Sequence, residues 1–202
     1  MTDDAKLLAA WGAGDRGAGE ALVLRHYDAI VRFFRNKAGD QADDLVQRTF
    51  LVCAERATGF RGEGSVRGFL FGIARNVLFD HIRGQVRARG QEPDFHSSAL
   101  ADLAPGVATL AARRADHRVL LAALQHVPVD LQVLLELYYW EDLSMDELSQ
   151  ILEIPAGTVK SRLHRARGLL REATAKVPAL PAETESARLL LEQWAAKLGA
   201  AD

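Results

Sequence analysis

Apolar residues recur at intervals of three and four along almost the whole chain, and no stretch clearly alternates between apolar and polar residues. Intervals of three and four place apolar side chains on one face of an α-helix, whereas alternation is typical of a strand. One apolar stripe runs from Val23 to Phe34, and another runs from Phe69 to Ile82. The sequence therefore predicts an all-α fold.

Glycine and proline divide the expected helices into two groups. Helical spacing lapses between about residues 90 and 115, where the composition is that of a linker and includes Pro93 and Pro105. We predict two small helical domains joined by a flexible linker and followed by a short C-terminal helix. The expected ranges are 1–90 for the first domain, 91–115 for the linker, 116–173 for the second domain and 174–202 for a C-terminal extension with an amphipathic helix.

The composition excludes several classes of protein. The 202 residues are 49% hydrophobic and 26% charged, which is typical of a globular protein rather than a disordered chain. No apolar run approaches the roughly 20 residues that span a bilayer, and the acidic start lacks the positive charge of a signal peptide. We expect a cytoplasmic protein without membrane insertion. The single cysteine, Cys53, excludes an internal disulfide and a cysteine-based zinc site.

Charge is distributed unevenly along the chain. Six arginines and two acids lie between Arg61 and Arg89, and a second basic stretch runs from Lys160 to Arg171. Residues 131–159 contain six acids and neither lysine nor arginine. Two basic stretches in a protein of net charge −2 fit two surfaces that face a polyanion such as nucleic acid. The same arginines could equally solvate ordinary helices, and charge counting alone does not separate the two interpretations.

The sharpest local pattern lies between Ser144 and Arg171. Ser144 and Glu147 have the spacing of a capping box, and Pro155 suits the first position of a second helix. In that second helix the apolar residues face one side and the basic residues face the other. A helical hairpin with a basic solvent face would share this pattern, but two helices with a tight turn and a basic second helix favour a helix-turn-helix that enters the major groove of DNA. The expected DNA-binding residues are Lys160, Ser161, Arg162, His164, Arg165 and Arg167.

Four segments carry a resemblance to one family. Val159–Arg167 resembles region four of bacterial RNA polymerase sigma factors of the extracytoplasmic-function (ECF) class. In the first domain, Asp43–Phe50 is similar to the core-binding helix of region two, and Phe60–Ser65 is similar to its promoter-melting loop. Phe69–Asn76 resembles the helix behind that loop, although Phe69 stands where the family usually has tryptophan. These segments follow the family's order and spacing.

The resemblance implies a sigma factor that binds core RNA polymerase and directs promoter-specific transcription initiation. The first domain would bind polymerase and open the minus-ten element, the second would read the minus-thirty-five element, and the linker would thread between them. The implied polymerase-binding residues are Asp43, Asp44, Gln47 and Arg48. The implied residues at the minus-ten element are Phe60, Arg61, Asn76, Asp80, Arg83 and Arg87.

Ordinary structural alternatives stay open for these assignments. Asp43 and Asp44 could only stabilise a helix N-terminus, Phe60 could only anchor its loop, and Asn76 could be a surface amide. For the whole chain, the alternatives are a helix-turn-helix regulator that acts without recruiting polymerase and an interaction protein that mimics a sigma domain. The apolar stripe at 187–198 either packs on the second domain or bridges both domains.

The sequence contains no recognisable catalytic or cofactor motif. The six histidines lack metal-ligand spacing, and the chain has neither a phosphate-binding glycine loop nor a nucleophile elbow. We therefore expect no enzyme activity, no metal and no cofactor. The expected partners are core RNA polymerase and promoter DNA, and the sequence leaves open whether an anti-sigma protein also binds.

Overall fold

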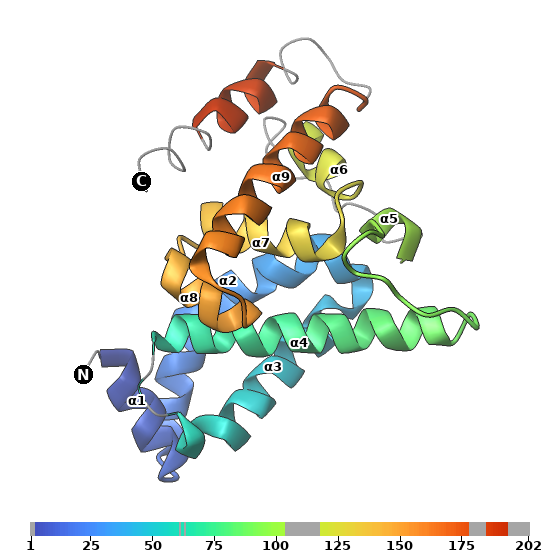
Figure 1. The fold of residues 1–202 in the computed structure, drawn as a ribbon. Coiled ribbons are helices and arrows are strands. Elements are labelled where there is room, and N and C mark those ends of the chain that lie inside the picture. The colour runs from blue at the N-terminus through green and yellow to red at the C-terminus, as the bar shows by residue number, and fades with distance from the viewer. Residues whose placement is uncertain (1–2, 61, 63, 104–117, 178–184, 194–202) are drawn as a thin grey trace.

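The protein is built from helices, as the all-α prediction requires (Figure 1). The computed structural model describes residues 3–60, 62, 64–103, 118–177 and 185–193, and this part of the chain contains no β-strand. Its named helices are α1 (Asp3–Gly12), α2 (Arg16–Ala38), α3 (Ala42–Arg56), α4 (Val66–Arg87), α5 (Leu100–Leu103), α6 (Arg118–Leu124), α7 (Val129–Tyr139), α8 (Met145–Leu152) and α9 (Ala156–Thr174). Residues 185–193 are also helical.

The first helix group, α1 to α4, forms around large apolar side chains. The Phe33 ring packs edge-on against the rings of Phe34 and Phe71, with centroids 5.2 and 5.8 Å apart. The Ser65 hydroxyl caps the start of α4 by accepting the backbone N–H three residues further on at 2.9 Å. The apolar stripes predicted for α2, α3 and α4 supply this core.

The second helix group, α6 to α9, has α7 at its centre. Every residue from 129 to 138 is buried, including three with polar or charged side chains, Asp130, Gln132 and Glu136. A helix buried on all sides lies between two packing partners. One partner of α7 is α9, which also packs on α6 and α8.

The helix-turn-helix is made by α8 and α9. The capping box is confirmed: the Ser144 hydroxyl accepts from the backbone N–H of Glu147, and the Glu147 carboxylate accepts from the backbone N–H of Ser144. The turn contains Glu153 in a left-handed conformation with φ of 54°. Helix α9 begins at Ala156, so Pro155 is its N-cap rather than its first residue.

The described part of the predicted linker, residues 91–103, packs against both helix groups. The Phe95 carbonyl accepts from the backbone N–H of Asp130 at 3.2 Å, and the Ala101 N–H donates to the Gln125 carbonyl at 3.0 Å. The short helix α5 buries Leu100 completely. This stretch is therefore ordered by contacts that the linker-like composition did not indicate, while residues 104–117 lie outside the described chain.

The C-terminal helix at 185–193 carries part of the apolar stripe predicted there. Ala187 is fully buried, and Leu190 and Leu191 pack half-buried against the main apolar core. The remaining stripe residues, Trp194 and Leu198, lie outside the described residues. None of the described helices is both long and apolar enough to cross a membrane.

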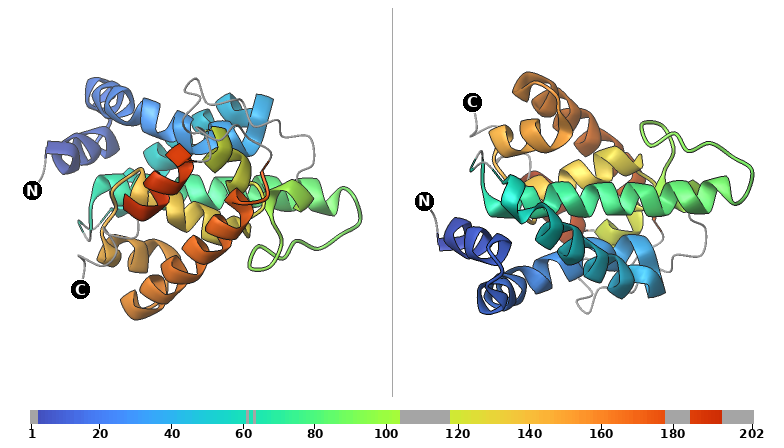
Figure 2. Two further views of the ribbon diagram at one scale, coloured as in Figure 1. Left: turned by 90° about the horizontal axis from the view of Figure 1, so that it is seen from above. Right: turned by 90° about the horizontal axis from the view of Figure 1, so that it is seen from below.

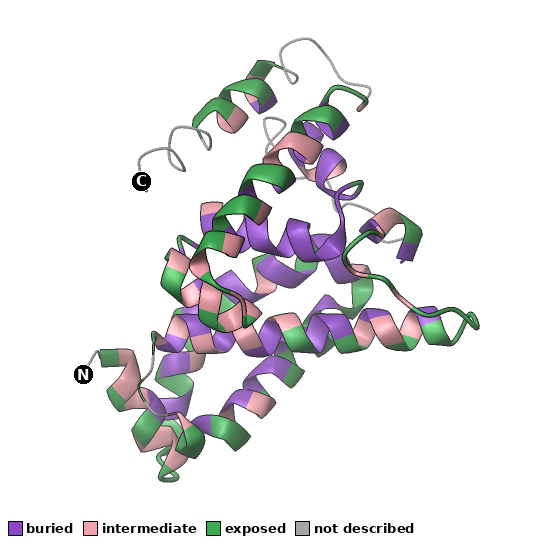
Figure 3. Ribbon diagram, viewed as in Figure 1, coloured by how far each residue is buried: buried purple, intermediate pink, exposed green. Residues whose placement is uncertain are grey.

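The second helix group sits directly on the first. In Figure 1, α7 and α8 lie over α2 and α4, and the two views in Figure 2 keep the groups in contact. Buried residues continue from one group into the other without an exposed layer between them (Figure 3). This arrangement determines which surfaces of each group remain accessible.

Candidate functional site

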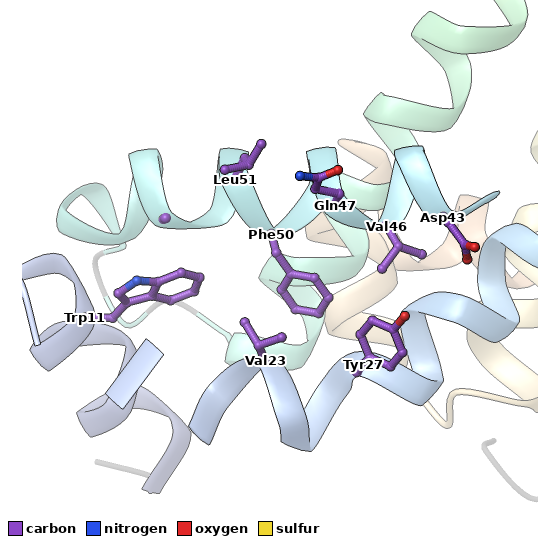
Figure 4. Close-up of a pocket in the computed structure, with 9 residues that line it drawn as sticks. Trp11, Val23, Tyr27, Asp43, Val46, Gln47, Phe50 and Leu51 are labelled. Atoms are coloured by element: carbon purple, nitrogen blue, oxygen red, sulfur yellow. The ribbon is translucent and has the colours of Figure 1, made fainter. Parts of the chain in front are cut away.

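An apolar groove lies between α2 and α3 in the first helix group. It has a volume of about 330 Å³. In Figure 4, Val46 and Phe50 of α3 point toward Val23 and Tyr27 of α2. Tyr27 is 44% exposed, and Leu51 on the groove wall is 57% exposed. Exposed apolar surface gathered in one concave place indicates a binding site; we name it the α2–α3 groove.

The polar residues predicted to bind polymerase lie on the exposed side of α3. Asp43 and Gln47 form part of the groove wall, while Asp44 and Arg48 are exposed beside it. The N-cap residue of α3 is Gln41, which makes no side-chain cap hydrogen bond. The two aspartates in the first turn therefore stabilise the helix dipole without capping it directly, and their carboxylates remain available to a partner.

Sequence analysis missed the apolar part of this groove. Tyr27 fell on the stripe assigned to the core, yet it lies at the surface. Leu51 is an apolar residue off the buried stripe of α3, and it follows Gln47 by four positions, so both share one helix face. An exposed leucine one turn after a predicted binding residue is the signal that could have revealed the groove.

A second cavity, of about 340 Å³, lies between α4 and the loop residues Gly59, Phe60 and Ser65 that precede it. Phe60 and Asn76, predicted to lie together at the minus-ten element, both line it, and the Phe60 ring lies 5.2 Å from the Phe69 ring. Four residues of the second helix group complete its wall: Glu147, Gln150, Ile151 and Glu153. We name it the Phe60–Asn76 pocket. Arg61 lies outside the described residues.

The remaining residues predicted at the minus-ten element continue along α4 away from this pocket. Asp80 pairs with Arg83 at 2.5 Å, and the Arg83 guanidinium lies 5.7 Å from the Phe95 ring. Arg87 pairs with Glu92 at 3.5 Å. The polar strip predicted on α4 is thus present, but its charges are engaged within the chain.

Helix α9 presents four of its six predicted DNA-binding residues to solvent. These residues are Lys160, Ser161, His164 and Arg165. Arg162 instead turns toward α7, where its guanidinium lies 3.8 Å from the Asp130 carboxylate. Arg167 hydrogen-bonds Tyr139, whose pKa is raised by burial and lowered in part by that arginine. The buried face of α9 carries Val159, Leu163, Ala166 and Leu170, as its spacing predicted.

The described residues offer no centre for metal or thiol chemistry. They contain no group of three or more histidine, cysteine, aspartate or glutamate side chains that could hold a metal ion. Cys53 is fully buried in the first helix group, and burial raises the pKa of its thiol to about 12. Such a thiol behaves as a small apolar side chain.

Two family models match the chain in the order of the predicted motifs. Residues 22–88 match Sigma-70 region 2, and residues 117–170 match Sigma-70, region 4. A helix-turn-helix regulator that acts without polymerase does not account for the first match. The region 2 match contains the α3 residues and both Phe60 and Asn76, and the region 4 match contains the helix-turn-helix.

Curated relatives and solved structures agree with these matches. The chain is 32% identical over 170 residues to the ECF RNA polymerase sigma factor SigM of Mycobacterium tuberculosis, covering 83% of this chain and 82% of SigM. It is 29% identical over 185 residues to the RNA polymerase sigma-H factor of Pseudomonas aeruginosa, covering 84% of this chain and 93% of that factor.

Two solved structures share the fold. CnrH in complex with the cytosolic domain of CnrY matches with a TM-score of 0.63 and 23% identity, covering 86% of this chain and 99% of CnrH. The sigma factor RpoE of Bartonella quintana, in complex with the anti-sigma factor NepR, matches with a TM-score of 0.62 and 23% identity. The match covers 79% of this chain and 98% of the solved chain. With regions 2 and 4 in sequence and a relative of 32% identity matched over most of its length, the chain belongs to the ECF RNA polymerase sigma factors, which direct the initiation of transcription.

Proposed function

We propose that the α2–α3 groove is the surface through which this sigma factor binds core RNA polymerase. The observation that carries this assignment is the combination of exposed Tyr27 and Leu51 with the acidic rim at Asp43. A helix of polymerase with an apolar face would bury Tyr27 and Leu51 in this groove. A basic residue at the edge of that helix would pair with the Asp43 carboxylate. Asp44, Gln47 and Arg48 extend this contact along α3.

The exposed strip of α9 would read the minus-thirty-five element. Lys160, His164 and Arg165 project from the same accessible face, so they can enter a major groove together. Arginine and lysine donate to guanine acceptors and to phosphates, and Ser161 can contact either. Arg162 and Arg167 are engaged by α7 and would hold the phosphate backbone rather than bases.

The Phe60–Asn76 pocket would hold a base extruded from the non-template strand of the minus-ten element. Phe60 and Phe69 supply an aromatic surface for stacking, and the Asn76 amide can both donate to and accept from a base edge. Asp80, Arg83 and Arg87 continue along α4 in the direction that a single strand would follow. Residues 1–90 would then bind polymerase and open DNA, and residues 116–173 would anchor the promoter.

We further propose that the protein acts by binding alone, without catalysing a reaction, and that it works in the cytoplasm with polymerase. CnrH and RpoE were each solved with a second protein, CnrY and NepR respectively. A comparable anti-sigma protein would compete with polymerase for the α2–α3 groove, because exposed Tyr27 and Leu51 give the groove apolar surface that a partner can bury.

Transcription reconstituted from purified components tests the function. The full chain, added to core enzyme and a library of promoter fragments, should yield transcripts from a defined subset that core enzyme alone does not transcribe. Specific binding to duplex DNA without core enzyme, together with no transcription in its presence, would favour a helix-turn-helix regulator instead. Binding to neither DNA nor core enzyme would favour an interaction protein.

A further inference from the structure

A stack of aromatic and cationic side chains lies on α4, outside the two cavities. The Phe79 ring of α4 lies nearly parallel to the Phe95 ring, with centroids 4.5 Å apart and planes at 18°. The guanidinium carbon of Arg75 lies 4.4 Å from the centroid of the Phe79 ring, and that of Arg83 lies 5.7 Å from the centroid of the Phe95 ring. A cation thus accompanies each ring. We name the α4 side chains of this stack, Arg75, Phe79 and Arg83, the α4 platform.

Phe95 reaches the platform from the segment that follows α4. The chain reverses after α4 near Gly90, whose φ of 72° suits glycine (Figure 1). Residues 91–98 read Gln-Glu-Pro-Asp-Phe-His-Ser-Ser, so Phe95 is the only large apolar side chain among them. Asp94, His96 and Ser97 beside it are exposed. Phe95 can therefore leave the platform by rotation of its side chain, without unfolding a helix.

The stack has the geometry of a base on an aromatic side chain. Nearly parallel rings at this distance are the arrangement in which aromatic groups stack, and proteins that bind single strands combine such rings with basic side chains along the backbone. Arg75 and Arg83 stand about one turn before and one turn after Phe79 on α4. Guanidinium groups stack on bases and pair with phosphates. The platform therefore offers a nucleotide both a stacking face and cations.

The cations of the platform retain capacity for a further ligand. Nε of Arg75 is buried without a hydrogen-bond partner, and a terminal nitrogen of that side chain donates to the Asn76 side-chain oxygen at 3.3 Å. Arg83 pairs with Asp80 at 2.5 Å, but the two side chains are 38% and 54% exposed. Exposed ion pairs stabilise little. A nucleotide at this surface can therefore supply an acceptor for Arg75 and replace Asp80 at Arg83.

The α4 platform adjoins the Phe60–Asn76 pocket. Phe79 follows Asn76 by three positions, so the two side chains lie near each other on one side of α4, about 4.5 Å apart along the helix axis. Adjacent nucleotides of one strand are about 3.4 Å apart in a duplex and farther apart when the strand is extended. A strand with one base in the pocket would therefore carry a neighbouring base to Phe79.

We propose that the α4 platform is a stacking site for a second unpaired base of the promoter strand, next to the base in the Phe60–Asn76 pocket, and that Phe95 fills this site while DNA is absent. The inference rests on the proposed role of that pocket. The ligand is a nucleobase of single-stranded DNA. Stacking depends on ring area rather than on hydrogen-bonding groups, so a purine binds better here than a pyrimidine.

Strand binding by the holoenzyme tests the platform. Holoenzyme is titrated with a fluorescent single strand from a promoter that it transcribes, and each base in turn is replaced by an abasic site. The wild type should lose affinity at the pocket base and, about tenfold, at one neighbouring base. Phe79→Leu should bind the intact strand about tenfold more weakly and should not respond to the abasic neighbour. Phe71→Leu removes a ring from the buried face of α4 against Phe33, and this matched control should bind as the wild type does.

Asn76→Ala separates failure of the platform from failure of the pocket. If Asn76→Ala weakens strand binding but Phe79→Leu does not, the platform is wrong while the pocket stands. If neither variant alters strand binding, the proposed role of α4 is itself wrong. The abasic series changes only the DNA, so it applies even if Phe79→Leu fails to fold. A wild-type loss confined to the pocket base would overturn the platform.

The free factor tests the role of Phe95. Phe95→Ala vacates the platform and should bind oligodeoxyadenylate at least about fivefold more tightly than the wild type, because apparent affinity scales with the fraction of sites that are unoccupied. Oligodeoxythymidylate of equal length should show a smaller gain. Phe95→Tyr keeps the stacked ring and should bind as the wild type does, and Phe79→Leu/Phe95→Ala should lose the gain. Equal affinities of Phe95→Ala and the wild type, including no detectable binding by either, would overturn the occupancy of the platform by Phe95.

Discussion

The ring of Phe95 stacks on the ring of Phe79, with centroids 4.5 Å apart and planes 18° from parallel. Phe79 belongs to α4, whereas Phe95 lies in the segment that connects the helix groups. Because the same segment hydrogen-bonds the start of α7, it joins α4 to the second group. The connection between regions 2 and 4 is therefore part of the packed structure rather than a tether beside it.

Replacing Phe95 by alanine should destabilise the folded protein. The variant loses a stacked aromatic pair and the apolar contact of a half-buried ring, together about 1–2 kcal/mol of unfolding free energy. Urea denaturation followed by circular dichroism measures the loss. Phe95→Tyr keeps the stacking ring and should retain nearly all the stability. Equal stability of the alanine and wild-type proteins would show that the stack contributes nothing.

Leu51→Lys should weaken core binding without unfolding the protein. The leucine is 57% exposed, so its replacement leaves the core intact, but it places a charge on the wall of the α2–α3 groove. Loss of one well-buried interface residue costs on the order of 2 kcal/mol, or about thirtyfold in Kd. Fluorescence titration with core enzyme measures this, and Leu189→Lys, at a 47% exposed leucine of the C-terminal helix, is the matched control. Similar Kd values for both variants would place polymerase elsewhere.

Arg165→Ala should reduce promoter binding by the holoenzyme and relax its sequence preference at one position. A bidentate contact from arginine to a base contributes roughly 1–3 kcal/mol of discrimination. Competition binding with single-base variants of the upstream element measures both effects. Arg162 is half-buried beside Asp130, so Arg162→Ala should weaken binding more uniformly across sequences. A uniform loss for Arg165→Ala would assign that side chain to phosphate.

Asn76→Ala should impair the opening of promoter DNA while sparing its initial recognition. The exposed amide lies in the wall of the Phe60–Asn76 pocket, and its loss removes hydrogen bonds available only to an unpaired base. Closed complexes should form normally, and transcription should recover on a template with a pre-melted bubble. An equal defect on duplex and bubble templates would remove the assignment of Asn76 to strand opening.

Stability should fall as the pH drops below neutrality. His26 is buried with its Nε2 2.9 Å from Asp4, and burial lowers its pKa below the ordinary 6.5 despite that carboxylate. The unfolded chain therefore binds more protons than the folded chain between the lowered pKa and 6.5, and folding loses free energy through that window. Burial also lowers the pKa of His81, so His26→Gln should reduce the pH dependence without abolishing it.

Urea denaturation at about pH 7.5 and about pH 5.5 measures this dependence. The exposed His126 provides the control, because His126→Gln should leave the dependence as in the wild type. An unaltered dependence in His26→Gln would assign the effect to other groups.

Local sequence patterns were sufficient to predict the helices and the helix-turn-helix. The capping box at Ser144 and Glu147 and the apolar spacing of α9 each act within one or two turns, so the sequence displays them directly. The position of Arg162 was not predictable in this way. Its distance from Asp130 depends on how α7 packs on α9, and helical spacing alone assigned it to the DNA-binding face.

Long-range electrostatic contacts were beyond the sequence patterns. The sequence shows six acids between 131 and 159 without indicating that any is buried, yet Glu136 and Glu141 are buried against cations of α2 and α4. Lys37 lies 99 positions before its partner Glu136, and Arg67 lies 74 positions before its partner Glu141. A carboxylate in a helix looks the same in the sequence whether it faces water or a buried lysine.

The polar character of α7 also affects how the two helix groups find their register. In the observed packing Glu136 meets Lys37, and Glu141 meets Arg67. A shifted packing would bury these charges without partners, which costs several kcal/mol of folding free energy. The charged pairs therefore favour one register of α7 on the first helix group over its apolar alternatives.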